Sequence, residues 1–225
     1  MIVADRKSLA EILNSIKEYK KIMLMACGGC VTVCFSGGEK AAELLASQIR
    51  IARRKQGNDI EIIECIPKRQ CEYEFIDPLK GDIESVEAVL SIACGVGVQT
   101  MSEHFPDMIT IPGLNTKFMG YPVEHAFWSE RCAGCGDCVL GWTGGLCPIA
   151  RCAKKLFNGP CGGSRDGKCE VSGDDDDIEC IWHSIYERLK KLNKLDNLLK
   201  VREAKDWRTS INAGQRNAKF EEAML

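Results

Sequence analysis

Eight of the fourteen cysteines in this 225-residue chain lie within residues 131–181, and this crowding constrains the fold more than any other feature. The segment is also rich in glycine and shows little helical or strand periodicity. A stretch with so few core side chains does not usually fold on hydrophobic burial alone. Metal binding supplies the missing free energy in such segments, because the ligands converge only in the folded state. The sequence therefore predicts a metal-held region in the second half of the chain.

The expected compartment favours reduced thiols. The N-terminus places charges at residues 5–7 and has no continuous apolar segment, so it does not resemble a secretory signal. No run approaches the roughly 18 apolar residues of a membrane-spanning helix. We therefore expect a cytoplasmic protein without membrane insertion. In that compartment clustered cysteines more often hold metal or carry out redox chemistry than form disulfides.

Composition argues against several other functions. Thirty basic and 32 acidic residues leave a net charge of −2, so no strong field attracts nucleic acid or anionic lipid. The HExxH, Walker A and GxSxG motifs of hydrolytic and phosphoryl-transfer enzymes are missing from the sequence. Gly95-x-Gly97 is a weak match to a phosphate-binding turn, because Thr100 stands where the third glycine belongs.

The first half of the chain alternates between strand and helix patterns. Apolar stripes predict helices at residues 9–16, 39–55 and 99–105, and apolar runs predict strands at residues 22–26, 60–66, 88–93 and 108–111. Parallel strands need crossover connections, so this order favours an α/β fold with a small parallel sheet and covering helices. The prolines and glycines of residues 112–130 predict a loop.

Three parts are predicted along the chain. Residues 1–125 form the α/β domain, whose strand ends carry cysteines. Residues 126–195 form an irregular, cysteine-rich iron-sulfur domain that ends in an amphipathic helix at about residues 178–192, after the acidic run 174–177. Residues 196–225 form a polar tail that frays or docks on a partner. Apolar surface for docking, or else for a core, is offered by Trp182, Trp207, Leu198 and Leu199.

Six cysteines of the α/β domain follow or end its predicted strands: Cys27, Cys30, Cys34, Cys65, Cys71 and Cys94. The carboxyl ends of parallel strands lie along one edge, where open α/β sheets bind ligands, so these thiols should converge on one rim. Cys65 is embedded in a strand and is expected in the core. The other five are candidate ligands of a 4Fe-4S cluster. Two alternatives stay open, namely a thioredoxin-like dithiol and cysteines that serve as small buried hydrophobes.

The spacing in the second region is the strongest metal signal. Cys132-x2-Cys135-x2-Cys138 is followed, after eight residues, by Cys147 and Pro148. Two-residue spacings let thiolates wrap one cubane, and bacterial ferredoxins also place a proline after the fourth cysteine, although their gap is shorter. The remaining four cysteines are Cys152, Cys161, Cys169 and Cys180. Eight thiolates suffice for two 4Fe-4S clusters, so we expect two or three clusters in the whole chain.

Cluster sulfur also needs hydrogen-bond donors. We expect them from backbone N–H groups around Gly134, Gly136, Gly144, Gly145, Gly162 and Gly163. Zinc at a four-cysteine site is the main alternative, because such sites are common structural zinc centres. His183 lies one helical turn after Cys180 and could complete a zinc site of three cysteines and one histidine. The pairing of ligands stays open, since ferredoxin runs share cysteines between two clusters.

Several long segments resemble a known family. CAGCGDC, GWTGGLCPIARCAKKLFNGPCGGSRDGKCEV and CIWHSIYERL are similar to the methylenetetrahydrofolate reductase C-terminal-domain family. Together with MACGGCVTVCFSGGEK and LSIACGVGVQT, they make residues 20–195 resemble the MetV-type subunits of acetogen-like methylenetetrahydrofolate reductases. The resemblance implies a non-catalytic subunit with iron-sulfur centres. These would connect an electron-donor protein or module to the flavin of a TIM-barrel catalytic subunit.

The implied reaction is the reduction of 5,10-methylenetetrahydrofolate to 5-methyltetrahydrofolate in the reductive acetyl-CoA (Wood-Ljungdahl) pathway. Because this chain contains no barrel, the folate and flavin sites would belong to the other subunit. We weigh three functions: an iron-sulfur electron-transfer subunit, a zinc-stabilised structural adaptor that assembles the reductase complex, and a thiol oxidoreductase that uses Cys27 and Cys30. The eight clustered cysteines and the rim set favour the first.

Overall fold

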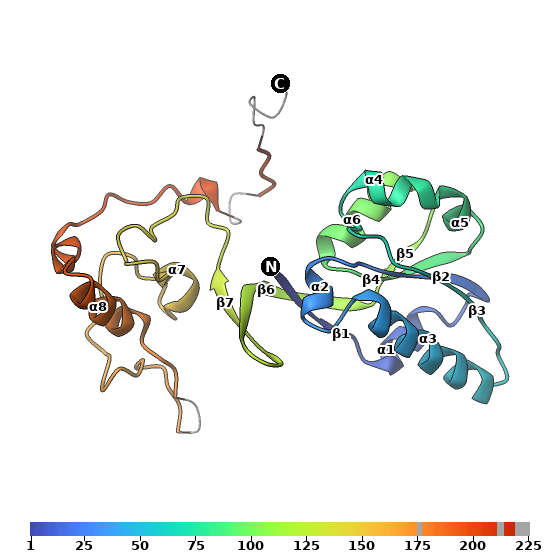
Figure 1. Cartoon of the computed structure of the whole chain (residues 1–225), viewed down its shortest axis with the longest axis horizontal. Helices are drawn as coiled ribbons and strands as arrows, with labels where there is room; N and C mark the ends of the chain where they lie inside the picture. The colour runs from blue at the N-terminus through green and yellow to red at the C-terminus, as the bar shows by residue number, and fades with distance from the viewer. Residues whose placement is uncertain (175–176, 211–213, 219–225) are drawn as a thin grey trace. The chain divides into compact units, whose positions relative to one another are not determined.

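The computed structural model describes residues 1–174, 177–210 and 214–218, and the chain divides into two units, residues 1–129 and 130–225. A four-stranded sheet forms the centre of the first unit (Figure 1). Its strands, in spatial order, are β3 (Glu61–Cys65), β2 (Lys21–Ala26), β4 (Ala88–Ile92) and β5 (Thr110–Pro112). All neighbouring strands are parallel. The predicted α/β fold with a small parallel sheet is therefore confirmed.

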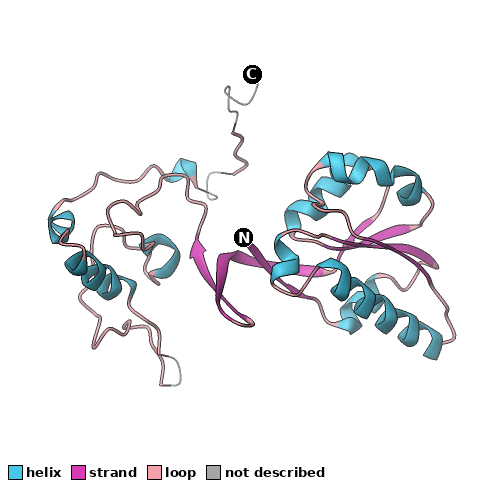
Figure 2. Cartoon of the chain, viewed as in Figure 1, coloured by secondary structure: helices cyan, strands magenta, loops and turns pink. Residues whose placement is uncertain are grey.

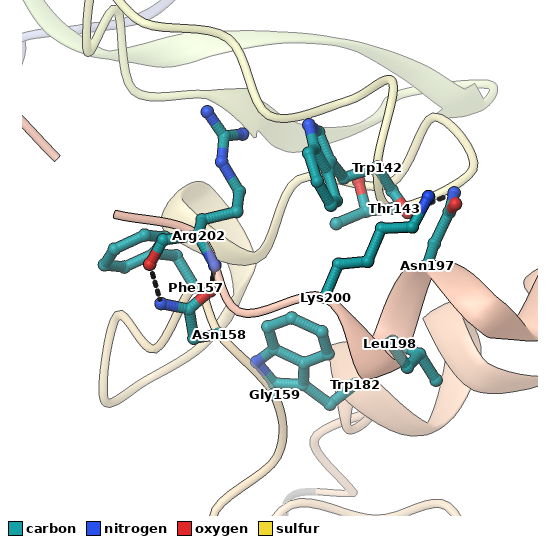
Figure 3. A pocket seen from close by; sticks show the side chains of 10 residues that line it. All are labelled: Trp142, Thr143, Phe157, Asn158, Gly159, Trp182, Asn197, Leu198, Lys200 and Arg202. Carbon is teal, nitrogen blue, oxygen red and sulfur yellow. Dashed lines mark hydrogen bonds between the residues drawn. The ribbon is translucent and has the colours of Figure 1, made fainter. Parts of the chain in front are cut away.

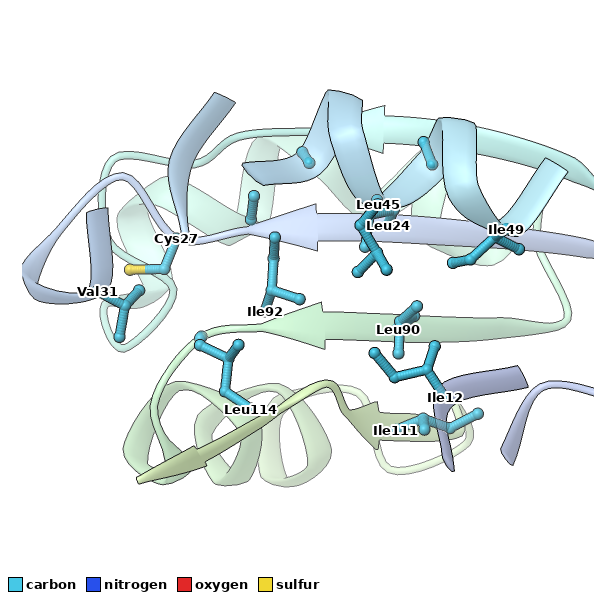
Figure 4. Close-up of a cluster of buried hydrophobic side chains, with 14 of the residues drawn as sticks. Ile12, Leu24, Cys27, Val31, Leu45, Ile49, Leu90, Ile92, Ile111 and Leu114 are labelled. Atoms are coloured by element: carbon cyan, nitrogen blue, oxygen red, sulfur yellow. The ribbon is translucent and has the colours of Figure 1, made fainter. Parts of the chain in front are cut away.

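Helices cover both faces of this sheet (Figure 2). On one face, Leu24 and Leu90 pack against Leu45 of α3 (Gly38–Lys55) and Ile12 of α1 (Leu9–Ser15) (Figure 4). The opposite face buries a second cluster that contains Met23, Met25 and Val89. The helices on that side are α4 (Tyr73–Ile76), α5 (Lys80–Glu84), which follows a 3-10 turn at Asp77–Leu79, and α6 (Gly95–His104). Alternate strand residues thus supply two cores, as the period of two in a strand requires.

The order of the strands defines a ligand-binding position. From β2 the chain crosses to β3 on one side and then returns to β4 on the other side of β2. The connections therefore diverge between the carboxyl ends of β2 and β4. Open α/β sheets bind their ligands at such a switch point.

A second sheet occupies residues that the sequence predicts as loop. It contains β1 (Ile2–Arg6), β6 (Leu114–Glu124) and β7 (Phe127–Cys132), in the order β1-β6-β7. The prediction of a loop at residues 112–130 is therefore wrong. β6 pairs antiparallel with the N-terminal strand, a partner too distant in sequence for a local pattern to reveal. Gly120 marks a close approach inside this sheet, because a Cβ there would lie 2.1 Å from the Ser129 carbonyl oxygen.

The second unit has little regular structure. Its helices are α7 (Pro148–Arg151) and α8 (Ile181–Lys191), and 3-10 turns occur at Leu195–Leu199 and Trp207–Thr209. α8 confirms the predicted amphipathic helix. It begins at Ile181 with Cys180 as its N-cap, and its first turn contains no acidic residue. The predicted acidic run 174–177 lies partly outside the described residues, which omit 175 and 176. Within the described ranges, no helix is long and apolar enough to cross a membrane.

Candidate metal sites

Four cysteines lie on the loops and helix starts that follow β2, β3 and β4, beside the switch point of the parallel sheet. Cys27 follows β2, Cys30 begins α2 (Cys30–Val33), Cys71 lies between β3 and α4, and Cys94 caps the N-terminus of α6. Figure 4 shows Cys27 just beyond the ends of β2 and β4. We call Cys27, Cys30, Cys71 and Cys94 the rim cysteines.

Electrostatic interactions link the rim cysteines to one another. Partial burial raises the pKa of the Cys71 thiol, although the residue as a whole is exposed, and the charges of Cys27 and Cys94 raise it further. The pKa of Arg69 is raised first by its hydrogen bond to Glu72 and, more weakly, by Cys71 and Cys30. Cys71 therefore lies within electrostatic range of Cys27 and Cys94, which are 67 positions apart in the sequence.

A buried glutamine holds the Cys71 loop in place. The Gln70 side chain is fully buried, and its Nε2 donates to Ser91 Oγ at 2.7 Å and to the Gly97 carbonyl oxygen at 3.0 Å. The Ser91 hydroxyl donates in turn to Gln70 Oε1 at 2.9 Å. Ser91 belongs to β4 and Gly97 to α6, so these bonds tie the Cys71 loop to the two elements that flank Cys94.

The structure places Cys34 and Cys65 apart from the rim cysteines. Cys34 Sγ lies 3.4 Å from the Ala4 carbonyl oxygen and 3.2 Å from Ser36 Oγ. It lines a groove of about 610 Å³ together with Phe35 and Trp128. Cys65 packs against the core on the α4–α6 face, and burial raises its pKa. Cys65 therefore lies half-buried at the edge of the core and not fully inside it as expected.

Backbone N–H groups approach three cysteine sulfurs in the second unit. Gly134 N lies 3.4 Å from Cys132 Sγ, and Gly163 N lies 3.4 Å from Cys161 Sγ. Ala150 N also lies 3.4 Å from Cys147 Sγ. Gly134 and Gly163 therefore supply N–H donors to cysteine sulfur, and their role toward a bound cluster stays a prediction. Thiolates that bind metal accept such hydrogen bonds, which orient the ligand and tune the metal.

The other cysteines of this unit occupy two environments. Cys152 and Cys180 belong to a small core with Trp182 and Ile185, and Cys169 packs against it. Cys161 Sγ lies 3.7 Å from Glu170 Oε2. The hydrogen bond from Lys154 lowers the pKa of Glu170, so cationic and anionic groups both flank this sulfur. Cys135 and Cys138 lie on the loop that follows β7.

The cysteines and N–H groups of the second unit are of the kind that bind metal through sulfur. Their side chains, however, do not surround a metal position. All fourteen cysteines are free. Within the described residues, no three His, Cys, Asp or Glu side chains form a group that could hold a metal ion. The N–H groups directed at sulfur nevertheless match the needs of thiolate ligands. In addition, Arg202 Nη1 is buried and has no hydrogen-bond partner among the described residues. Iron-sulfur clusters and zinc both suit these donors.

The tail packs on the cysteine loop of its own unit. We call residues 195–210 the strap. Asn158 exchanges two hydrogen bonds of 2.9 Å with the backbone of Arg202 (Figure 3), and Thr209 Oγ1 donates to the Cys135 carbonyl oxygen at 2.9 Å. This part of the tail therefore does not fray, contrary to one of the two expectations, and docking on a partner stays a prediction. The predicted tail residues 211–213 and 219–225 lie outside the described residues.

The predicted docking residues separate into buried and exposed groups. Trp182 is only 4% exposed and belongs to the core of the second unit, so of the two expectations, docking surface or core, the second holds for this residue. Leu199 and Trp207 remain exposed. The cavity between Trp142, Trp182 and the strap measures about 30 Å³ (Figure 3), room for about one water molecule. It is too small for an organic cofactor.

Gly136 is the position where the strap depends most on the cysteine loop. Its φ is +82°, and a Cβ there would lie 2.3 Å from the Thr209 carbonyl oxygen. We expect Gly136→Ala to release the strap and to lower the free energy of unfolding of this unit by about 2 kcal/mol or more. Limited proteolysis within residues 195–210 would measure the release. Gly141→Ala is the matched control, because a Cβ at Gly141 meets no atom within 4 Å. Equal proteolysis of both variants would contradict the prediction.

Comparison with known proteins identifies one related domain. Residues 111–208 match a family model described as "Methylene-tetrahydrofolate reductase C terminal". The matched region contains all eight cysteines of residues 131–181 and most of the strap, whereas the rim cysteines lie outside it. No curated protein and no solved structure matches the chain.

Proposed function

We propose that this chain is the iron-sulfur electron-transfer subunit of a methylenetetrahydrofolate reductase complex. One observation carries the proposal: within the region matched by the reductase family model, backbone N–H groups are directed at cysteine sulfurs. Metal-bound thiolates accept such hydrogen bonds, which orient the ligand and tune the metal; the bond from Ala150 N also caps α7. The number of cysteines in this region, eight, suits two 4Fe-4S clusters.

The chain's own residues would hold, shield and tune these clusters. The ligands would be Cys132, Cys135, Cys138, Cys147, Cys152, Cys161, Cys169 and Cys180. Bound 4Fe-4S clusters supply electron transfer at potentials that depend on hydrogen bonds, charge and exposure. Gly134, Ala150 and Gly163 donate to sulfur, while the Trp182 core and the strap limit access of water to part of the region.

The rim cysteines are proposed as a third cluster site, with Cys27, Cys30, Cys71 and Cys94 as ligands. Their position at the switch point and the tethering of the Cys71 loop by Gln70 support this assignment. The N-terminus of α6, which Cys94 caps, favours negative charge there. Cys34 is left out because its thiol contacts Ala4 and Ser36 instead.

Electrons would pass from a donor protein or module, through this chain, to the flavin of a separate catalytic subunit. That subunit would reduce 5,10-methylenetetrahydrofolate to 5-methyltetrahydrofolate. This chain would contribute no catalytic residue. The second candidate is a zinc-stabilised adaptor, which the small core of the second unit favours, because structural zinc supports folding in such regions.

Metal and sulfide analysis of the full chain, purified without oxygen, separates the two candidates. We expect a brown protein with about eight to twelve irons and a similar amount of acid-labile sulfide per chain, as two or three cubanes require. Dithionite should produce paramagnetic centres, which should then reduce the flavin of the catalytic subunit on mixing. A colourless chain that contains only zinc would overturn the electron-transfer proposal and support the adaptor.

A further inference from the structure

The strap buries a lysine against the first cysteine loop. The Lys205 side chain is 1% exposed. Burying an ammonium group is costly unless hydrogen bonds and anions compensate for the lost water. Its Nζ donates to the Asp137 carbonyl oxygen at 2.9 Å and lies 3.4 Å from Asp137 Oδ2. Asp137 stands between Cys135 and Cys138, so the cation reaches the centre of the cysteine loop.

The same carbonyl oxygen also contacts a cysteine sulfur. Cys135 Sγ lies 3.6 Å from the Asp137 carbonyl oxygen that accepts from Lys205. The ammonium group and the sulfur therefore share one neighbour. An ammonium has three donors. Besides Asp137, Lys205 Nζ has the Trp207 ring 5.7 Å away and the Asp206 carboxylate within electrostatic range. A thiolate at Cys135 would add a further negative charge beside this ammonium.

Two further cations reach this loop. Arg202 Nη2 lies 3.9 Å from Asp137 Oδ1, and Arg216 Nη1 donates to the Gly134 carbonyl oxygen at 2.9 Å. Arg202 also keeps the buried, unpartnered Nη1 described above. Two basic side chains thus share one carboxylate on the Cys132–Cys138 loop, and a third contacts the backbone of that loop. The excess positive charge fits a site that holds several thiolates.

We propose that Lys205 is a positioning residue that makes the cluster bound by the Cys132–Cys138 loop easier to reduce. The inference rests on the proposed function, since it requires a cluster at this loop. Reduction adds negative charge, which a nearby cation stabilises. The effect is larger for a buried cation than for an exposed one, because water screens it less. The strap would therefore tune the potential of this site from a segment that contributes no ligand.

The test is a redox titration of the full chain followed by paramagnetic resonance. Lys205→Met keeps the length of the side chain and removes the charge. We expect it to decrease the ratio of reduced to oxidised cluster about tenfold at a fixed potential, which is a shift of about 59 mV to lower potential for a one-electron couple. Lys205→Arg should largely restore the value. Lys191→Met is the matched control, because Lys191 is exposed on α8.

A second variant separates tuning from a merely structural role. Asp137→Asn removes the carboxylate that Lys205 and Arg202 share and leaves both cations. We expect it to raise the potential, opposite to the effect of Lys205→Met. If Lys205→Met loses its iron, Asp137→Asn alone decides, and an unchanged or lowered potential would overturn the inference. The inference would also be overturned if both variants keep their iron and sulfide and show unaltered potentials. A wild-type chain without iron and sulfide would instead overturn the proposed function itself.

Discussion

Removal of bound metal should unfold the second unit and leave the first unit folded. The first unit buries two hydrophobic clusters, one on each face of its parallel sheet. Among the described residues of the second unit, the hydrophobic cluster has six buried members, two of which are the candidate ligands Cys152 and Cys180. Structural metal sites contribute on the order of 10 kcal/mol in comparably small units. Without that contribution, we expect the second unit to lose cooperative structure.

Hydrogen exchange, read peptide by peptide before and after metal removal by a chelator, measures both units in one sample. Amides of α8 should lose nearly all their protection, whereas amides of β2 and β4 should keep theirs. The first unit is thus an internal control for general damage. Undiminished protection of α8 after complete loss of metal would contradict the prediction and would assign the stability of this unit to its hydrophobic cluster.

The parallel sheet could be predicted from the sequence because its signals are local. The stripe that contains Leu45 and Ile49 defines α3, and the apolar runs define β2 and β4. The β1–β6 pairing could not be predicted in this way, since Ile2 pairs with Met119 and neither segment contains information about the other. Gly120 and Pro122 are of residue types that are typical of loops, yet both lie in β6. The missing side chain of Gly120 lets the neighbouring strand approach closely.

The candidate site was predictable to a similar degree. The spacing identified the cysteines and the glycines that follow them, and the order of the strands predicted a meeting at one edge. The sequence could not reveal where each side chain points. Cys34 follows Cys30 closely in sequence, but it ends α2 and is succeeded by Phe35 at φ +60°, so the chain turns away there. The strap was also missed, because its contacts are hydrogen bonds from polar residues without periodic spacing.

The proposed rim cluster can be tested sharply, because Cys34, one of the five predicted ligands, lies apart from the four rim cysteines. Cys30→Ser and Cys71→Ser should each remove the rim cluster, a loss of about four irons per chain. Both residues are exposed, so their replacement should not disturb the core. Cys34→Ser is the matched control. Its hydroxyl can keep the hydrogen bond to the Ala4 carbonyl oxygen, and the iron content should stay unchanged.

Iron and sulfide per chain, together with the resonance signals of the remaining clusters, measure the result. The signals of the second unit should persist in all three variants, because its eight cysteines are intact. Persistence of these signals would show that the iron is lost from the rim site alone. If Cys34→Ser loses as much iron as Cys71→Ser, then Cys34 is a ligand and the loop after α2 must rearrange on metal binding. If none of the three variants loses iron, the meeting of thiols at the switch point holds no cluster.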